Sequence, residues 1–414
     1  MTLIKTSILS LIATFFKMLS GLIINKAISI YIGPAGLAII GQFQNFSQLV
    51  LIAAQGAINS GVIKYTAEYS KDEKKLSELF STAGKISLIT SLTVGFILIS
   101  FSTFFSENVL SNIKYQFIFI IYGITIVLFV LNGLLLSIIN GLKDIRNYIK
   151  INIVQSLYSL LFTSLLIYFF NLSGALIALT INQSIIFFIT LFLIKKNNII
   201  HIDQFKNNFD KKIAKKLFSF SVMALTSAIM IPTSQFIIRN YISKTQGLEQ
   251  AGYWQGIWYI STTYLMIVTT TLSTYYLPRL SEITNKKELK KEILQGYKIL
   301  LPLAIISGIV IYLFRNLIIY ILFSPDFESM SPLFLWQIIG DTIKISSWLC
   351  SYLMIAKAMT KSFIFTEISF SIIFVSTSIA AINHYGTIGV TYAYCLSYFI
   401  YFLFVFYILI KRLK

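Results

Sequence analysis

The chain has 414 residues, of which 56% are hydrophobic and only 12% are charged. Soluble globular domains carry about 25% charged residues, so this composition excludes a soluble protein and indicates a chain whose solvent is lipid. The net charge of +18 does not indicate nucleic-acid binding, because the lysines lie in short breaks between apolar runs and not on a soluble basic face.

Signals for chemistry at a metal or a cofactor are weak. Cys350 and Cys395 lie in apolar segments without a partner at metal-binding spacing. Gly56 and Gly61 have the spacing of a phosphate-binding loop, but Val62 stands where that loop needs lysine. We therefore expect no catalytic residue, no metal site and no cofactor, and no enzymatic activity.

Twelve apolar stretches approach the length of about 20 residues that crosses the hydrocarbon core of a bilayer. They lie near residues 6–32, 36–63, 84–105, 115–140, 149–170, 173–194, 217–243, 251–277, 299–322, 331–356, 362–383 and 387–410. The first resembles a signal peptide, but Lys17 interrupts it and no small-residue cleavage site follows, so we expect it to be retained. The sequence predicts an all-α polytopic membrane protein with 12 transmembrane helices.

The two halves of the chain echo each other at a nearly constant offset. Glu68 returns as Glu282 and Lys143 as Lys357, each 214 positions later, and Gly174 returns as Gly389 after 215. We therefore predict two pseudo-symmetric six-helix lobes, 1–194 and 217–414, joined by the basic cytoplasmic linker 195–216. An even number of helices in each half gives both halves the same orientation, as in transporters built from parallel repeats.

The basic residues predict the orientation. The termini and alternate loops hold 27 of the 34 lysines and arginines, whereas the opposite loops hold only Lys114 and Lys244. Because positively charged loops stay in the cytoplasm, both termini are predicted to be cytoplasmic, in a bacterial inner membrane.

Cations inside apolar stretches are costly and tend to mark a transport pathway. Lys17 and Lys26 lie in the first stretch, and Arg239 lies in the seventh at a depth that matches Lys26. Lys64 and Arg279 follow the second and eighth stretches. Cations along one route indicate an anionic substrate; the alternative is that they are anchors at the membrane interface.

Amide and aromatic side chains supply candidate contacts for sugars. Gln44, Gln48, Gln55 and Asn59 are spaced to share one face of a helix, although amides serve helix–helix contacts more often. Trp254, Gln255 and Trp258 open the eighth stretch; tryptophans there stack on sugars or belong to the aromatic belt of the membrane.

Asp341 and Lys344 lie three residues apart, and with Gln337 they form a polar stripe on the tenth stretch. Acid and base at this spacing are expected to form an intrahelical pair. This pair is a candidate for either a structural or a gating role.

Several of these segments resemble the Wzx flippases of the multidrug/oligosaccharidyl-lipid/polysaccharide exporter superfamily, above all those for O-antigen and for enterobacterial common antigen (lipid III). The resemblance spans the whole chain, and the segments that carry it are Gly33-Pro34-Ala35-Gly36-Leu37, Val62-Ile63-Lys64-Tyr65-x-Ala67-x-Tyr69, Trp254-Gln255-Gly256, Tyr276-Leu277-Pro278-x-Leu280-Ser281, Trp336-Gln337-x-x-Gly340-Asp341-x-x-Lys344 and Ile355-Ala356-Lys357-Ala358.

This resemblance implies two six-helix lobes around a central cavity and a flippase that moves undecaprenyl-diphosphate-linked oligosaccharide from the inner to the outer leaflet by alternating access. It leaves a polysaccharide polymerase and a chain-length regulator as candidate protein partners. Related lipid II flippases carry arginines on helices 1 and 8; Lys17 and Lys26 match the former only approximately, and helix 8 has no internal cation here.

Two other functions stay open. A drug antiporter of the same superfamily would need acidic residues in its cavity to bind a cationic drug, and this chain has few acidic residues. A polytopic glycosyltransferase or ligase would need a large polar external loop, and no external gap exceeds about ten residues.

Overall fold

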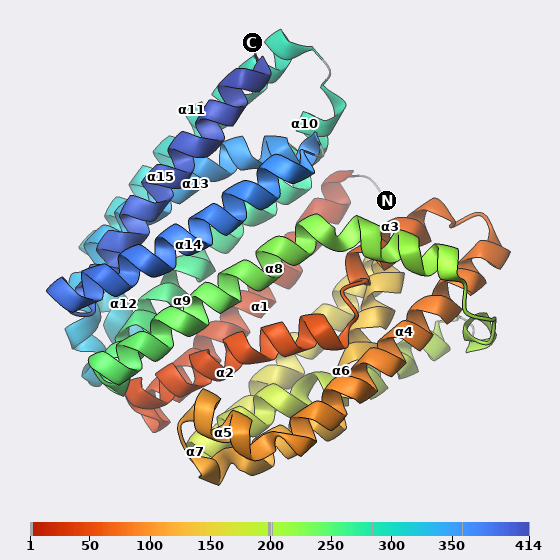
Figure 1. Ribbon diagram of the computed structural model, residues 1–414, viewed down its shortest axis with the longest axis horizontal. Helices are drawn as coiled ribbons and strands as arrows, with labels where there is room; N and C mark the ends of the chain where they lie inside the picture. The colour runs from red at the N-terminus through yellow and green to blue at the C-terminus, as the bar shows by residue number, and fades with distance from the viewer. Residues whose placement is uncertain (1–2, 198–199, 201, 284, 358, 414) are drawn as a thin grey trace. The chain divides into compact units, whose positions relative to one another are not determined.

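The computed structural model describes residues 3–197, 200, 202–283, 285–357 and 359–413, and these residues form helices and short connections without a strand (Figure 1). The chain divides into two compact units. Unit 1 comprises Met1–Tyr31 and Gln42–Pro232, and unit 2 comprises Ile32–Gly41 and Thr233–Lys414. The predicted all-α class is confirmed.

Unit 1 is built around α6 (Gln116–Gly141), which packs on α3, α4 and α7. Its other helices are α1 (Leu3–Tyr31), most of α2 (Gly33–Ala54), α3 (Asn59–Glu68), α4 (Glu73–Ser100), α5 (Ser102–Leu110), η1 (Ile113–Tyr115), α7 (Ile145–Lys196) and η2 (Ile202–Phe205). Where α4 crosses α6, a Cβ on Gly95 would lie 2.5 Å from the carbonyl oxygen of Gly123. Small residues at such crossings let helix backbones approach closely in lipid.

The basic segment 195–216 packs against α4. Ser77 Oγ donates to the carbonyl oxygen of Gln204 at 3.0 Å, and Lys85 Nζ donates to that of Asn207 at 2.8 Å. The rings of Phe80 and Phe205 stack. The segment therefore belongs to unit 1, together with the first half of α8 (Lys211–Thr245), and the lobe boundary expected at residue 217 moves to residue 233.

The long helix α7 contains a reversal at Asn171, whose φ of 49° and ψ of −127° are not helical. Asn182 Nδ2 donates to Thr163 Oγ1 at 3.0 Å, although residues 19 apart in a straight helix would be about 28 Å apart. The two apolar stretches predicted within α7 therefore lie side by side, as separate segments.

Unit 2 is built around α13 (Phe334–Ala356), which packs on α9, α11, α14 and α15. Its other elements are the second half of α8, α9 (Leu248–Thr271), the π-helical turn η3 (Leu272–Tyr276), α10 (Leu277–Glu282), α11 (Lys286–Leu313), α12 (Arg315–Leu322), η4 (Pro325–Leu333), α14 (Thr360–Tyr385) and α15 (Ile388–Leu413). Helices α14 and α15 lie side by side (Figure 1).

The two halves of the sequence have similar turns at equivalent positions. Gly33 and Gly247, 214 positions apart, both have positive φ, and so do Asn171 and Gly386. After the latter turns, a Cβ on Gly174 would meet the carbonyl oxygen of Leu166 at 1.9 Å, and one on Gly389 would meet that of Ala381 at 2.3 Å. Those turns need residues that tolerate left-handed backbone or close approach.

Among the described residues, seven helices are long and apolar enough to span a membrane by length and composition alone: α2, α4, η1 with α6, α7, α11, α14 and α15. Large apolar side chains stay exposed along them, for example Phe96 on α4 and Ile306 on α11. Such a surface is stable only in lipid, so the chain is a multi-pass membrane protein. The helix count of twelve stays a prediction.

Candidate functional site

Arg239 on α8 is the most deeply buried of the predicted cations, with 1% of its surface exposed. Its Nη2 donates to Oε1 of Gln255 on α9, and its guanidinium lies over the ring of Trp254 at 5.3 Å. Within the part of the chain that the structure describes, its Nε and Nη1 have no hydrogen-bond partner. A buried guanidinium with free donors is costly to leave unpaired, and its fork matches a phosphate or carboxylate.

The start of α2 holds Gln255 in place. A Cβ on Gly41 would lie 2.5 Å from the Gln255 side chain, and one on Gly252 would lie 2.0 Å from the carbonyl oxygen of Pro34. This close packing of α2 on α9 involves Pro34 of the Gly-Pro-Ala-Gly segment and Gln255 of the Trp-Gln-Gly segment. Gly41, outside both segments, makes room for the glutamine that accepts from Arg239.

Asp341 on α13 is fully buried and accepts three hydroxyl hydrogen bonds. They come from Ser261 at 2.7 Å and Tyr264 at 2.6 Å, both on α9, and from Tyr394 on α15 at 2.7 Å. A Cβ on Gly340 would meet the Tyr394 ring at 2.4 Å, so Gly340 admits that ring against α13. The carboxylate thus joins three helices of unit 2.

Lys344 does not contact Asp341 directly, so the expected intrahelical ion pair is wrong in its geometry. Lys344 Nζ donates to the Tyr394 hydroxyl at 3.2 Å, and that hydroxyl donates to Asp341. The ammonium lies within 5.0–5.6 Å of the ring centres of four aromatic side chains, which are Trp258, Trp348, Tyr394 and Tyr398. A tyrosine bridge and cation–π contacts therefore replace the direct pair.

Trp254 and Trp258 are buried, with exposed fractions of 0% and 9%. Trp254 packs under Arg239, and Trp258 makes an edge-to-face contact with Tyr394. The aromatic-belt alternative is wrong, because side chains of the belt must reach the membrane surface. Stacking of these rings on sugars stays a prediction, and Trp254 has no exposed face in this structure.

The sequence predicted that the four amide residues of unit 1 share one helical face, and this prediction is wrong. Gly56 and Ala57 have positive φ, and this break ends α2 at Ala54 and begins α3 at Asn59. Gln55 and Asn59 nevertheless line one small cleft of about 100 Å³, together with Ser60 and the apolar residues Ile52, Ala57, Leu225 and Ala228. Gln44 is half-buried and Gln48 is exposed, both outside this cleft.

Lys17 and Lys26 lie on one continuous helix, α1, nine residues apart. At 100° per residue they point to opposite sides of that helix. Lys26 is half-buried and Lys17 is exposed. A single binding site beside a straight α1 therefore contacts only one of the two, and which one stays a prediction.

The remaining candidate cations, Arg279 in unit 2 and Lys64 in unit 1, differ in their surroundings. Arg279 lies 3.5 Å from a carboxylate oxygen of Glu292 and 3.9 Å from one of Glu282, so its charge is largely neutralised. Lys64 is exposed and lies over the Tyr65 ring at 4.9 Å. Lys216 donates to the Tyr69 hydroxyl, and this bond raises the pKa of Lys216.

Sequence reasoning missed the hydroxyls around Asp341. Ser261 and Tyr264 sit in a polar-looking run of α9, and Tyr394 sits in an apolar run of α15. The signal that could have found them is the buried acid itself: a carboxylate in a membrane needs donors, and tyrosines in neighbouring helices are the residues that supply them.

A membrane protein with two helical units, repeated turns and buried cations belongs to the class of transporters with internal repeats. A family model described as polysaccharide biosynthesis protein matches residues 3–284, and the chain belongs to that family.

The resemblance to lipid-linked oligosaccharide flippases is confirmed over almost the whole chain. Proteins named lipid III flippase from Escherichia coli (strain K12) and Shigella flexneri are each 27% identical over 402 residues, which is 97% of this chain and 97% of theirs.

Solved structures share the fold at low identity. An inward-facing multidrug resistance MATE family transporter of the MOP superfamily matches with a TM-score of 0.80 at 14% identity, covering 98% of each chain. A MOP superfamily transporter from Pyrococcus furiosus matches with a TM-score of 0.74 at 15% identity, over 99% of this chain and 95% of its own. These matches confirm the membrane transporter fold predicted from the sequence.

Proposed function

We propose that this protein is a flippase that moves undecaprenyl-diphosphate-linked oligosaccharide from the inner to the outer leaflet of a bacterial inner membrane by alternating access. The family and the full-length match to lipid III flippases support this reaction. Arg239 is the structural feature that most favours it, because two of its buried donors are unpartnered among the described residues.

The proposed substrate fits these donors by charge and shape. A diphosphate carries negative charge on several oxygens, and a guanidinium binds such oxygens with two parallel hydrogen bonds. In unit 1, the half-buried Lys26 on α1 is a further candidate contact for negative charge on the substrate. Gln55 and Asn59 offer amide donors and acceptors to sugar hydroxyls. Translocation breaks no covalent bond, so no catalytic residue and no cofactor are proposed.

A drug antiporter shares this fold, but the candidate residues argue against a cationic substrate. The buried cation Arg239 has free donors, whereas the buried acid Asp341 is saturated by three hydroxyls. Neither residue attracts a cation from solvent. Arg239 is itself positive, and the carboxylate oxygens of Asp341 already accept hydrogen bonds from the protein.

Translocation in proteoliposomes tests the function. The probe is an undecaprenyl-diphosphate-linked saccharide with a fluorophore, and a membrane-impermeant reductant quenches only the outer leaflet. We expect the inner-leaflet fraction to become accessible with the protein and to stay protected in protein-free liposomes. A protected fraction that is the same in both would contradict the proposal. Phosphatidylcholine with the same fluorophore is the specificity control.

We propose that both termini and the segment 195–216 are cytoplasmic, and we expect a polysaccharide polymerase and a chain-length regulator to act on the product at the other side. A cysteine at the exposed Asn208 should stay unlabelled by an impermeant maleimide in intact cells, and one at the exposed Gln246 should be labelled. The background replaces Cys350 and Cys395 by serine. Labelling at Asn208 in intact cells, with none at Gln246, would reverse the orientation.

A further inference from the structure

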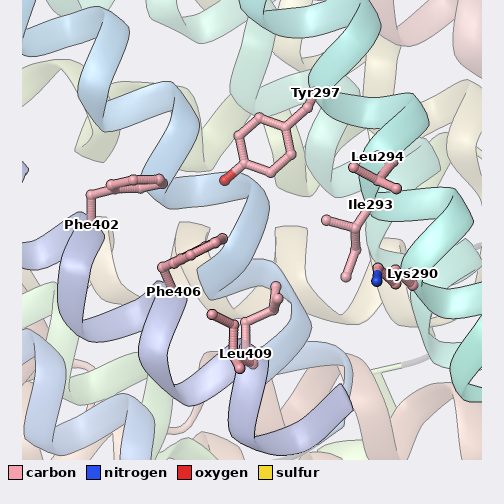
Figure 2. Close-up of a pocket in the computed structure, with 8 residues that line it drawn as sticks. Lys290, Ile293, Leu294, Tyr297, Phe402, Phe406 and Leu409 are labelled. Atoms are coloured by element: carbon pink, nitrogen blue, oxygen red, sulfur yellow. The ribbon is translucent and has the colours of Figure 1, made fainter. Parts of the chain in front are cut away.

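Unit 2 has a groove that the proposed substrate contacts do not use. Helices α11 and α15 both pack on α13, and a groove of about 580 Å³ separates them (Figure 2). Its lining residues come in two helical stripes, Lys290, Ile293, Leu294 and Tyr297 on α11 and Phe402, Phe406, Leu409 and Ile410 on α15. Its volume lies within the range of about 300–1,000 Å³ that is typical of ligand sites.

The groove is apolar along its length. Tyr297 contributes the one hydroxyl of the lining, and this hydroxyl is already engaged, because it donates to the carbonyl oxygen of Ser346 at 2.7 Å and lies 3.0 Å from Cys350 Sγ. Leu294 and Phe406 are 52% and 40% exposed, so the groove opens at the surface of unit 2. A flexible apolar chain is therefore the shape and chemistry that it accepts.

One end of the groove is cationic. Figure 2 shows Lys290 on α11 and Leu409 on α15 toward one end of the groove, and Tyr297 on α11 and Phe402 on α15 toward the other. Lys290 is exposed, and it forms no ion pair with another described residue. The same end carries further basic residues, since α11 begins there and α15 ends there: Lys286, Lys287, Lys291 and Lys411.

We propose that this groove binds one anionic glycerophospholipid, with an acyl chain between α11 and α15 and its phosphate at Lys290. Charge complementarity selects this occupant, because an apolar groove that ends in a cluster of lysines matches an acyl chain that ends in an anion. Basic pockets between transmembrane helices bind anionic headgroups in this way. A neutral chain would leave Lys290 without a counter-charge.

Lipid binding to the purified full-length protein tests this site by native mass spectrometry, with phosphatidylglycerol as the probe and phosphatidylethanolamine as the comparison. Lys290→Gln should weaken phosphatidylglycerol binding about fivefold, the effect of one lysine near a lipid headgroup. Lys298→Gln, at an exposed position of α11 outside both the lysine cluster and the groove lining, is the matched control and should bind as wild type. Binding of phosphatidylethanolamine should not change.

A second variant tests the apolar part. Leu294→Trp fills the groove and should abolish binding of phosphatidylglycerol. Ile299→Trp, on the exposed surface of the same helix, should leave that binding unchanged. A monodisperse elution profile checks that each variant is folded. Wild-type affinity in both Lys290→Gln and Leu294→Trp would overturn the proposal. Displacement of phosphatidylglycerol by a lower concentration of undecaprenyl diphosphate would also overturn it, because the groove would then belong to the transported lipid. Neither binding measurement uses translocation, so failure of the lipid-site proposal can be distinguished from failure of the proposed flippase function.

Discussion

Replacing Arg239 by methionine is expected to abolish translocation while the protein still reaches the membrane at its normal level. Methionine keeps the unbranched stem of arginine as far as the position of Nε, is apolar and adaptable, and so packs toward Trp254 without needing a partner. Replacing a buried charge by a well-packed apolar side chain is often neutral for stability. Loss of activity without loss of protein would therefore show that the positive charge of Arg239 serves substrate binding and not folding.

The size of the effect follows from the hydrogen bonds to phosphate that methionine cannot donate. A hydrogen bond to a charged group contributes about 1.5–3 kcal/mol, which corresponds to a factor of about 10–150 in affinity. Arg239→Lys keeps the charge but removes the fork, so it should retain more activity than Arg239→Met. Lys26→Ala, made alone, should also reduce translocation, because it removes the second proposed contact for the diphosphate. Complementation of a flippase-deficient strain, with membrane levels matched, measures each variant.

A matched control comes from the same unit. Arg315, the first residue of α12, donates hydrogen bonds to Ser331 Oγ and to the Tyr312 carbonyl oxygen, and its guanidinium lies over the Tyr312 ring. Arg315→Met should therefore support translocation. Gly41→Ala tests the same site indirectly, because the added methyl displaces the Gln255 side chain that accepts from Arg239. Full surface polysaccharide from the Lys26→Ala/Arg239→Met double variant would show that the substrate's charge is held elsewhere, with Lys17 the next candidate.

Asp341→Asn is expected to destabilise the protein, and Asp341→Asn/Lys344→Met is expected to restore much of its stability. The single change leaves the Lys344 ammonium buried among aromatic rings without its counter-charge. Removing one partner of a buried pair costs about 3–5 kcal/mol, and the Tyr394 bridge places this case at the lower end. Methionine at 344 removes the charge and packs well on aromatic rings.

Thermal unfolding of the detergent-solubilised protein measures both variants. Asp326→Asn is the control, because Asp326 is exposed and accepts only a 3.2 Å hydrogen bond from Ser324; it should leave the unfolding temperature unchanged. Equal destabilisation of the single and double variants would show that the two charges do not interact. A stable double variant without translocation would instead place Asp341 and Lys344 in the transport mechanism.

The sequence predicted the class of protein and its local elements well, because hydropathy is a local property of each segment. Every predicted apolar stretch falls largely within helical structure, and the fold class is confirmed. The helical break at Gly56 and Ala57 was missed. Nothing in the apolar pattern marks it, and a span predicted at 36–63 reads through it without interruption.

The sequence supplied candidate site residues but not the partners that they contact in the structure. In lipid, the inward and outward faces of a helix are equally apolar, since lipid tails are as apolar as leucine. Periodicity therefore does not tell which tryptophans are buried. For the same reason the sequence offered sugar stacking or the aromatic belt for Trp254 and Trp258, and it did not predict that they lie beneath Arg239 and beside Tyr394.

By itself, the sequence determined that this chain is a membrane protein, that its halves resemble each other and that cations are rare inside its apolar stretches. Only the tertiary structure decided that the basic segment packs on α4, that Tyr394 stands between Asp341 and Lys344, and that Arg239 meets Gln255. The reason is physical. Burial in lipid is a property of a segment's own composition. A hydrogen bond, in contrast, joins residues that are as many as 147 positions apart in the chain, and only the packing of the helices brings them together.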